Sequence, residues 1–170
     1  MTREIFEAVA DPYAYPGSDT LINKLGTHDP KELEAFELEM TTLRADEPLP
    51  RGRLSATHYK NIHHHLFQDV YDWAGKYRKS RIAKDVNVFC FPENIESEMR
   101  KLFGALKNVR FFKGLPAAQF SKSAAQFIAD LNAIHPFREG NGRTQMSFFD
   151  VLADAAGHPV DLNLIRRETF

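Results

Sequence analysis

The chain has a single cysteine, no long apolar run and almost no net charge, and each absence excludes a class of protein. Cys90 alone cannot build a disulfide framework, and one cysteine suits a reducing compartment. No apolar run approaches the roughly 20 residues that span a bilayer, and the first residues do not open a signal peptide. A net charge of −1 creates no basic field for nucleic acid or an anionic membrane. We therefore expect a soluble protein with no direct nucleic-acid or membrane partner, with export by a signal-independent route left open.

The 170 residues are most simply one domain, residues 1–170, with enough length to bury a core. Residues 1–28 contain a stretch rich in Pro, Gly and Tyr from Asp11 to Ser18 and predict an ordered but irregular segment. We find no internal repeat and no low-complexity linker. The last stretch, Asp161 to Phe170, has the pattern of the first turns of a helix, and its abrupt end leaves room for a continuation.

Helical periodicity recurs in five stretches, which predicts a mainly α fold. The expected helices cover about 30–45, 55–75, 93–109, 117–134 and 142–156. Asp29 and Ser55 are suitable N-caps for the first two, and Gly157 is a suitable C-cap for the last. The residues expected to face inward are Leu33, Phe36, Met40 and Leu43; Tyr59, Ile62, Leu66, Val70 and Trp73; Ile95, Met99, Leu102, Phe103, Leu106 and Val109; Phe120, Ala124, Phe127, Ile128, Leu131 and Ile134; and Met146, Phe149, Leu152 and Ala156.

A short β-hairpin is expected at about 81–91, between the second and third helices. The residues from Val86 to Phe91 alternate and favour a strand, and the three residues from Asp85 to Asn87 could form its bend. The basic run from Arg78 to Lys84 leads into it. This run either contacts phosphates or is simply solvated, and we assign Lys84 to nucleotide binding.

The richest chemistry lies in residues 133–145, where a tight loop joins the last two helices. An imidazole, a carboxylate, two glycines around an amide, and a guanidinium occupy the nine positions from His135 to Arg143. The N–H groups at a helix N-terminus lack internal partners and carry partial positive charge. A glycine-rich turn that leads into such a terminus is suited to bind an anion, above all phosphate.

Each group in this loop has a chemical interpretation and a structural alternative. His135 can act as a general base near neutral pH, or simply cap a helix. Glu139 beside phosphates makes sense if Mg²⁺ lies between them, whereas alone it is an exposed loop charge. Gly140 and Gly142, which flank Asn141, let the backbone approach an anion closely, or form a plain turn.

Arg143 is a cation in the first turn of a helix, where the dipole disfavours it, and this suggests an anionic partner. By contrast, His63-His64-His65 is a poor metal site, since adjacent residues on a helix point about 100° apart. Cys90 lies between two Phe residues in a strand pattern and is expected to be inert.

The string His135-Pro-Phe-Arg-Glu-Gly-Asn-Gly-Arg143 resembles the signature of the Fic domain, His-x-Phe-x-(Asp/Glu)-Gly-Asn-Gly-Arg-x-x-Arg. Asp11-Pro-Tyr-Ala-Tyr-Pro-Gly17 with Asn23-Lys-Leu-Gly26, and the segment from Phe67 to Gly75, also resemble Fic proteins of the cell-filamentation type. The resemblance implies a helical bundle with a β-hairpin flap. It also implies AMP transfer from ATP to a hydroxyl of a target protein, with release of pyrophosphate.

The resemblance also implies roles for single residues. His135 corresponds to the base, Phe137 to the residue that anchors the loop, and Glu139 to the Mg²⁺ ligand. Gly140, Asn141, Gly142 and Arg143 correspond to the phosphate-binding loop. The flap would hold a target segment by strand addition through Val86, Asn87, Val88 and Phe89.

Two departures from the family pattern leave alternatives open. Met146 stands where the family has its second arginine, which helps hold the γ-phosphate and pairs with an inhibitory glutamate. The inhibitory motif (Ser/Thr)-x-x-x-Glu-(Gly/Asn) has no match in the chain, so a small antitoxin or a continuation beyond Phe170 would supply that glutamate. The resemblance is then to toxins of bacterial toxin–antitoxin pairs or to host-directed effectors, in the bacterial cytoplasm or translocated into a host cell. Other donor chemistry, or a catalytically weak binding module, are the alternatives.

Overall fold

The computed structural model describes residues 11–84 and 87–161 and confirms a mainly α fold with a small hairpin. Its elements, in chain order, are α1 (Pro30–Ala45), α2 (Ala56–Phe67), β1 (Ala83–Lys84), β2 (Asn87–Val88), α3 (Pro92–Asn108), the 3₁₀ helix η1 (Arg110–Phe112), α4 (Ala117–Ile134) and α5 (Asn141–Ala156). None of the helices in this described part is long and apolar enough to cross a bilayer.

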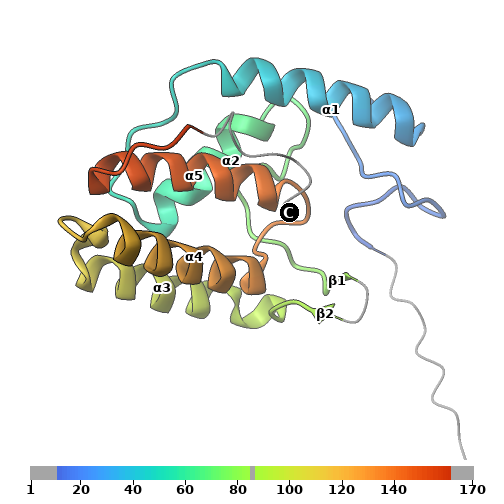
Figure 1. Cartoon of the computed structure of the whole chain (residues 1–170). Coiled ribbons are helices and arrows are strands. Elements are labelled where there is room, and N and C mark those ends of the chain that lie inside the picture. The colour runs from blue at the N-terminus through green and yellow to red at the C-terminus, as the bar shows by residue number, and fades with distance from the viewer. Residues whose placement is uncertain (1–10, 85–86, 162–170) are drawn as a thin grey trace, which may run out of the picture.

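The helices pack in consecutive layers (Figure 1). α3 lies against α4, α4 against α5, α5 against α2, and α2 against α1 at the outside of the stack. The core between them is aromatic: Tyr59, Phe103 and Phe148 are buried and in mutual ring contact. Because α4 and α5 pack against each other, the short loop that joins them lies at one end of this helix pair.

The first two helices begin at the expected caps. The Asp29 side chain accepts a hydrogen bond from the Lys31 N–H, and Pro30 occupies the first helical position. The Ser55 hydroxyl accepts one from the His58 N–H. These caps satisfy N–H groups that have no partner inside their helices.

The second helix was expected to reach Gly75, but α2 ends at Phe67. Val70 is still buried and Trp73 partly buried, yet both lie in turns that follow the helix. The Val70 carbonyl accepts from the Lys24 N–H at 2.8 Å, and Asp69 pairs with Arg44 at 2.6 Å. A tertiary contact therefore takes up the Val70 carbonyl, which a longer helix would have used, and the Asp69 side chain attaches the turn to α1.

The inward faces of α1 and α5 also differ from the expected ones. On α1, Leu43 is exposed whereas Thr41 is buried, because the face that packs on α2 and meets Arg143 is partly polar. On α5, Phe148 is fully buried, and the expected Phe149 and Met146 are only half-buried. On α3, the expected Val109 is exposed and follows the helix end.

The hairpin pairs Ala83 with Val88 and Lys84 with Asn87, in antiparallel register. Asn87 therefore belongs to the second strand and not to the expected bend. Asp85 and Val86, like the expected terminal helix beyond Asp161 and residues 1–10, lie outside the described residues. The base of the hairpin is attached to the end of α4, since the Cys90 N–H donates to the Ala133 carbonyl at 3.2 Å.

Candidate active site

His135 is the C-cap of α4 and adopts a left-handed conformation with φ of 49°. Its N–H donates to the Leu131 carbonyl at 3.1 Å, which closes the last turn of the helix. A left-handed non-glycine residue costs free energy, and such residues concentrate at functional sites. The Phe89 ring, next to β2, stacks on the imidazole at 4.0 Å between ring centroids. The hairpin and the candidate base are therefore direct neighbours.

The loop after His135 is closed by Asn141, the first residue of α5. Its side chain accepts from the Phe137 N–H at 3.0 Å and donates to the Phe137 carbonyl at 2.8 Å. Asn141 and Phe137 are both buried, and the Phe137 ring stacks between Tyr59 and His63. The loop between the two helices is thus held in place through both backbone polar groups of Phe137, its N–H and its carbonyl.

Gly140 is the N-cap of α5, and no other residue fits its place. Its φ is +78°, and an added Cβ would lie 2.2 Å from Cζ of Phe67. At Gly142, two residues further along the chain, an added Cβ would have no other atom within 4 Å. The first glycine is therefore required by packing, whereas the second borders open space at the helix N-terminus, where an anion could approach.

Glu139 and Arg143 lie together beside this open space. The Glu139 carboxylate accepts from the Gly140 N–H at 2.8 Å and lies 3.6 Å from the Arg143 guanidinium. Arg143 also pairs with Glu37 of α1 and donates to the Thr41 hydroxyl. The anionic partner that the misfit of Arg143 at a helix N-terminus suggested is, at least in part, a side chain of α1.

His63 of α2 connects this loop to the segment that leads to the hairpin. Its Nδ1 accepts from the Gly75 N–H at 2.8 Å, so Nε2 carries the proton and donates to the Glu139 carbonyl at 3.0 Å. Burial lowers the pKa of His63 to about 3, so the ring stays neutral. The other two histidines have separate partners: His64 contacts the Ala74 carbonyl, and His65 the Arg44 carbonyl.

Arg78 is neither solvated nor directed at a phosphate, contrary to both interpretations of the basic run at this position. Its side chain is 2% exposed and donates to the carbonyls of His135, Ser80, Cys90 and Ile134. Burial lowers the pKa of its guanidinium. Arg78 supplies positive charge and donors to the C-terminal end of α4, where carbonyls have no helical partner.

The irregular N-terminal segment also contacts the loop. Asp11 accepts from the Arg138 guanidinium at 2.7 Å, and the Tyr13 hydroxyl accepts from the Lys79 N–H at 2.9 Å. The Tyr13 ring packs edge-on against Trp73. The segment therefore covers one side of the loop that follows His135.

Of the remaining expected site residues, Lys84 and Asn87 pair through the hairpin, Val88 is exposed, and Val86 lies outside the described residues. Sequence patterns did not identify His63, Arg78 or Glu37 as neighbours of the loop. A carboxylate in a helical stripe that was expected to be apolar is the only local signal, and it applies to Glu37 alone.

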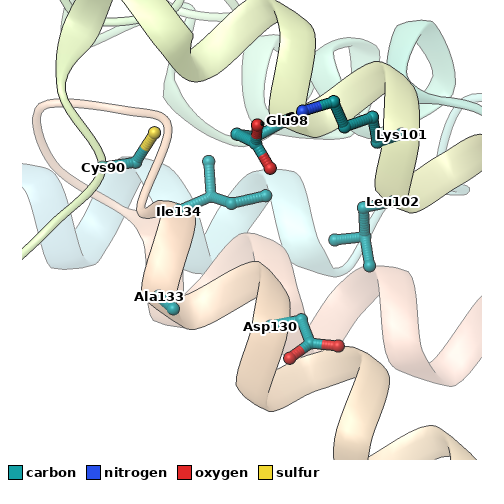
Figure 2. Close-up of a pocket in the computed structure, with 7 residues that line it drawn as sticks. All are labelled: Cys90, Glu98, Lys101, Leu102, Asp130, Ala133 and Ile134. Atoms are coloured by element: carbon teal, nitrogen blue, oxygen red, sulfur yellow. Dashed lines mark hydrogen bonds and ion pairs between the residues drawn. The ribbon is translucent and has the colours of Figure 1, made fainter.

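A shallow cavity of about 490 Å³ lies beside the hairpin, between α3 and α4. Figure 2 shows its lining, which is Cys90, Glu98, Lys101, Leu102, Asp130, Ala133 and Ile134. Lys101 pairs with Glu98 at 2.7 Å, and burial raises the pKa of the Cys90 thiol, which disfavours a reactive thiolate. The cavity ends one residue before His135 and takes no part in the loop itself.

The donor set around Glu139 fits a magnesium ion that is shared with a nucleotide. The described residues contain no group of three or more His, Cys, Asp or Glu that could hold a metal by themselves. Mg²⁺, however, usually takes one or two carboxylates and completes its shell with phosphates and water. The Glu139 side chain is 44% exposed and offers one such carboxylate at the mouth of the loop.

Comparison with known proteins gives consistent matches. The model of the Fic/DOC family matches residues 53–153. The chain is 44% identical to the "Probable protein adenylyltransferase y4lH" of Sinorhizobium fredii, over 97% of this chain and 86% of that protein. It is 37% identical to the "Probable protein adenylyltransferase Fic" of Escherichia coli, over 94% and 80% of the two chains.

Solved structures agree with the sequence matches. The crystal structure of BepC, a VirB-translocated effector of Bartonella tribocorum with bound AMPPNP, superposes with a TM-score of 0.81 at 30% identity. The superposition covers 92% of this chain and 83% of that one.

Proposed function

Because this chain belongs to the Fic/DOC family, we propose that it is a protein adenylyltransferase, which transfers AMP from ATP to a Ser, Thr or Tyr hydroxyl of a target protein. The observation that carries the proposal is the loop itself, which has an imidazole at one end and a guanidinium at the other, with an open helix N-terminus between them. Relatives that share most of the chain are named for this activity.

His135 acts in this proposal as the general base. It removes the proton of the target hydroxyl, whose oxygen attacks the α-phosphorus of ATP. The bond between the α-phosphorus and the bridging oxygen breaks, and pyrophosphate leaves. A positioned base of this kind accelerates such a step by roughly 10²- to 10⁴-fold. Phe89, which stacks on the imidazole, restricts the ring to one orientation.

The phosphates bind at the N-terminus of α5. Gly142 leaves room for the backbone N–H groups to reach them, and Arg143 adds charged donors. Asn141 contributes through its backbone and through the closed loop, because its side chain is already paired with Phe137. Lys84 is the further proposed nucleotide contact.

Glu139 would hold Mg²⁺ with the nucleotide phosphates, and the ion would neutralise phosphate charge during transfer. ATP carries several negative charges, and the Glu139 carboxylate alone would repel them. The proposed enzyme therefore requires a divalent cation.

The hairpin holds the target. Residues 86–89 would add a strand of the target protein through main-chain hydrogen bonds, so the modified hydroxyl comes next to His135. This proposal is supported by the exposed Val88 and by Phe89, which already contacts His135. Residues 1–170 would act as one catalytic domain.

The proposed regulation depends on a group outside residues 1–170. We propose that a small antitoxin, or a further segment of the natural protein, supplies an inhibitory glutamate. The enzyme would act in the bacterial cytoplasm as a toxin, or in a host cell after translocation as an effector. BepC, the effector structure with bound AMPPNP, is a relative that is translocated.

Labelled ATP tests the proposed reaction. The purified chain, Mg²⁺ and a cell lysate are incubated with ATP labelled on the α- or the γ-phosphate, and labelled proteins are separated by size. Relative to lysate incubated without the chain, added label is expected only from ATP labelled on the α-phosphate, with at least about a 100-fold loss in His135→Ala. His64→Ala, which removes an exposed imidazole, is the matched control. Label from the γ-phosphate above the level of lysate alone would show phosphate transfer, and equal labelling by His135→Ala would exclude His135 as the base.

A further inference from the structure

We propose that Glu37, on α1, is a positioning residue that holds Arg143 in the orientation in which it binds the nucleotide phosphates. This inference rests on the nucleotide-binding role proposed for Arg143. It also places part of the active site on a helix that the match to the Fic/DOC model, residues 53–153, does not include.

The arginine is held on α1 by two side chains one helical turn apart. Its Nη2 donates to the Glu37 carboxylate, and its Nη1 donates to the Thr41 hydroxyl at 3.2 Å. Positions four apart lie on the same face of a helix, so both acceptors point in one direction. The Thr41 hydroxyl is itself fixed, because it donates to the Glu37 carbonyl at 2.7 Å.

The acceptors are less exposed than the arginine. The Glu37 side chain is 13% exposed and that of Arg143 is 38% exposed, and Thr41 lies in the core. The buried Tyr71 hydroxyl donates to the other oxygen of Glu37. Burial, together with the negative charge of Glu37, raises the pKa of Tyr71, so the phenol keeps the proton it donates. A carboxylate with two such partners has little freedom to move.

The plane of the guanidinium is fixed by a third contact. Its central carbon lies 4.6 Å from the centre of the Phe67 ring. Two hydrogen bonds and a ring contact leave the side chain one orientation, while its five N–H groups exceed the number that α1 uses. Nη2, which also donates to Glu37, lies 3.6 Å from the carboxylate of Glu139, the proposed ligand of the ion. Such preorganisation reduces the entropy lost when phosphate binds.

The charges make this proposal distinguishable from a simple electrostatic role. Glu37, Glu139 and Arg143 together carry a charge of −1, so Glu37 makes the site less attractive to an anion. If Glu37 merely competed with phosphate for Arg143, removing its charge would strengthen nucleotide binding. If it positions the arginine, the same change weakens binding.

Calorimetric titration with AMPPNP and Mg²⁺ separates these two cases. Glu37→Gln keeps the shape but removes the charge, and we expect about tenfold weaker binding, from loss of a charge-assisted hydrogen bond. Glu39→Gln, the same change at an exposed position of α1, should bind as wild type. Thr41→Val removes the second acceptor and serves if Glu37→Gln does not fold; we expect weaker binding in the same direction.

Melting temperatures of all variants are measured alongside, since a purely structural role would lower stability without changing the affinity of the folded protein. Tighter or unchanged binding by Glu37→Gln, or by Thr41→Val in its place, would overturn the proposal. If wild type itself fails to bind AMPPNP with Mg²⁺, the proposed nucleotide site fails and this inference with it. Binding by wild type thus tests the proposed nucleotide site, and the comparison of Glu37→Gln with wild type tests the role of Glu37.

Discussion

Replacing His63 with phenylalanine tests whether α2 holds the candidate active-site loop through two hydrogen bonds. The phenyl ring keeps the stacking on Phe67 and Phe137, but it leaves the Gly75 N–H and the Glu139 carbonyl without their partner. The His63 side chain is fully buried, so water cannot replace the ring nitrogens. Each unpaired group costs about 1–3 kcal/mol, so we expect the free energy of unfolding to fall by about 2–6 kcal/mol near pH 7.5.

The pH dependence gives this prediction a second, independent part. The pKa of His63 is about 3 in the folded protein, below its ordinary value of 6.5, because burial disfavours the charged ring. The unfolded chain therefore binds a proton that the folded protein does not, and wild-type stability is lost as the pH falls from about 6.5 toward 3. Phenylalanine does not titrate. The difference in free energy of unfolding between wild type and His63→Phe should therefore be about 2 kcal/mol smaller at pH 5 than at pH 7.5.

Urea unfolding at pH 7.5 and pH 5.0, with EDTA present, measures both parts. Changes common to the two proteins cancel in the comparison. His64→Phe is the matched control: His64 is exposed and makes one hydrogen bond, to the Ala74 carbonyl, so the same substitution there should lower the free energy of unfolding by no more than about 1 kcal/mol. A loss below about 1 kcal/mol at pH 7.5, or a difference that does not change with pH, would refute the assignment of His63 as a neutral, doubly bonded histidine.

Three further substitutions test the loop and its supports. Gly140→Ala should destabilise the chain by about 2–4 kcal/mol, from a left-handed alanine and its overlap with Phe67, whereas Gly142→Ala should stay within about 1 kcal/mol of wild type in thermal melts yet bind AMPPNP more weakly. Arg78→Met should cost at least about 3 kcal/mol in urea unfolding, because it leaves several buried carbonyls unpaired; a cost below 1 kcal/mol would show that water replaces the guanidinium.

Much of the fold could be predicted because helices are specified by local spacing. The caps at Asp29 and Ser55, and the extent of α4, follow from residues within one or two turns of each other. The end of α2 could not be predicted this way. Val70 continues the apolar period beyond Phe67, but a hydrogen bond from Lys24, 46 positions earlier in the chain, decides the backbone there.

The face of α1 is a second case. Leu33, Glu37 and Thr41 form its inward stripe, and two of these three are polar. A periodicity of apolar residues cannot find such a stripe, because the reason for the polar groups is Arg143 on another helix. The same applies to Leu43, which the apolar pattern placed inward and the structure leaves exposed.

By itself, the sequence determined the candidate catalytic loop, because His135, Glu139, Gly140 and Arg143 lie within nine positions of one another, and residues so near in the chain cannot be far apart in space. Only the tertiary structure decided what holds that loop in place. Glu37 reaches Arg143 across 106 positions, His63 reaches Glu139 across 76, and Arg78 reaches His135 across 57. Contacts at such separations arise from the packing of α1, α2 and the hairpin segment around the loop, and no local pattern specifies them.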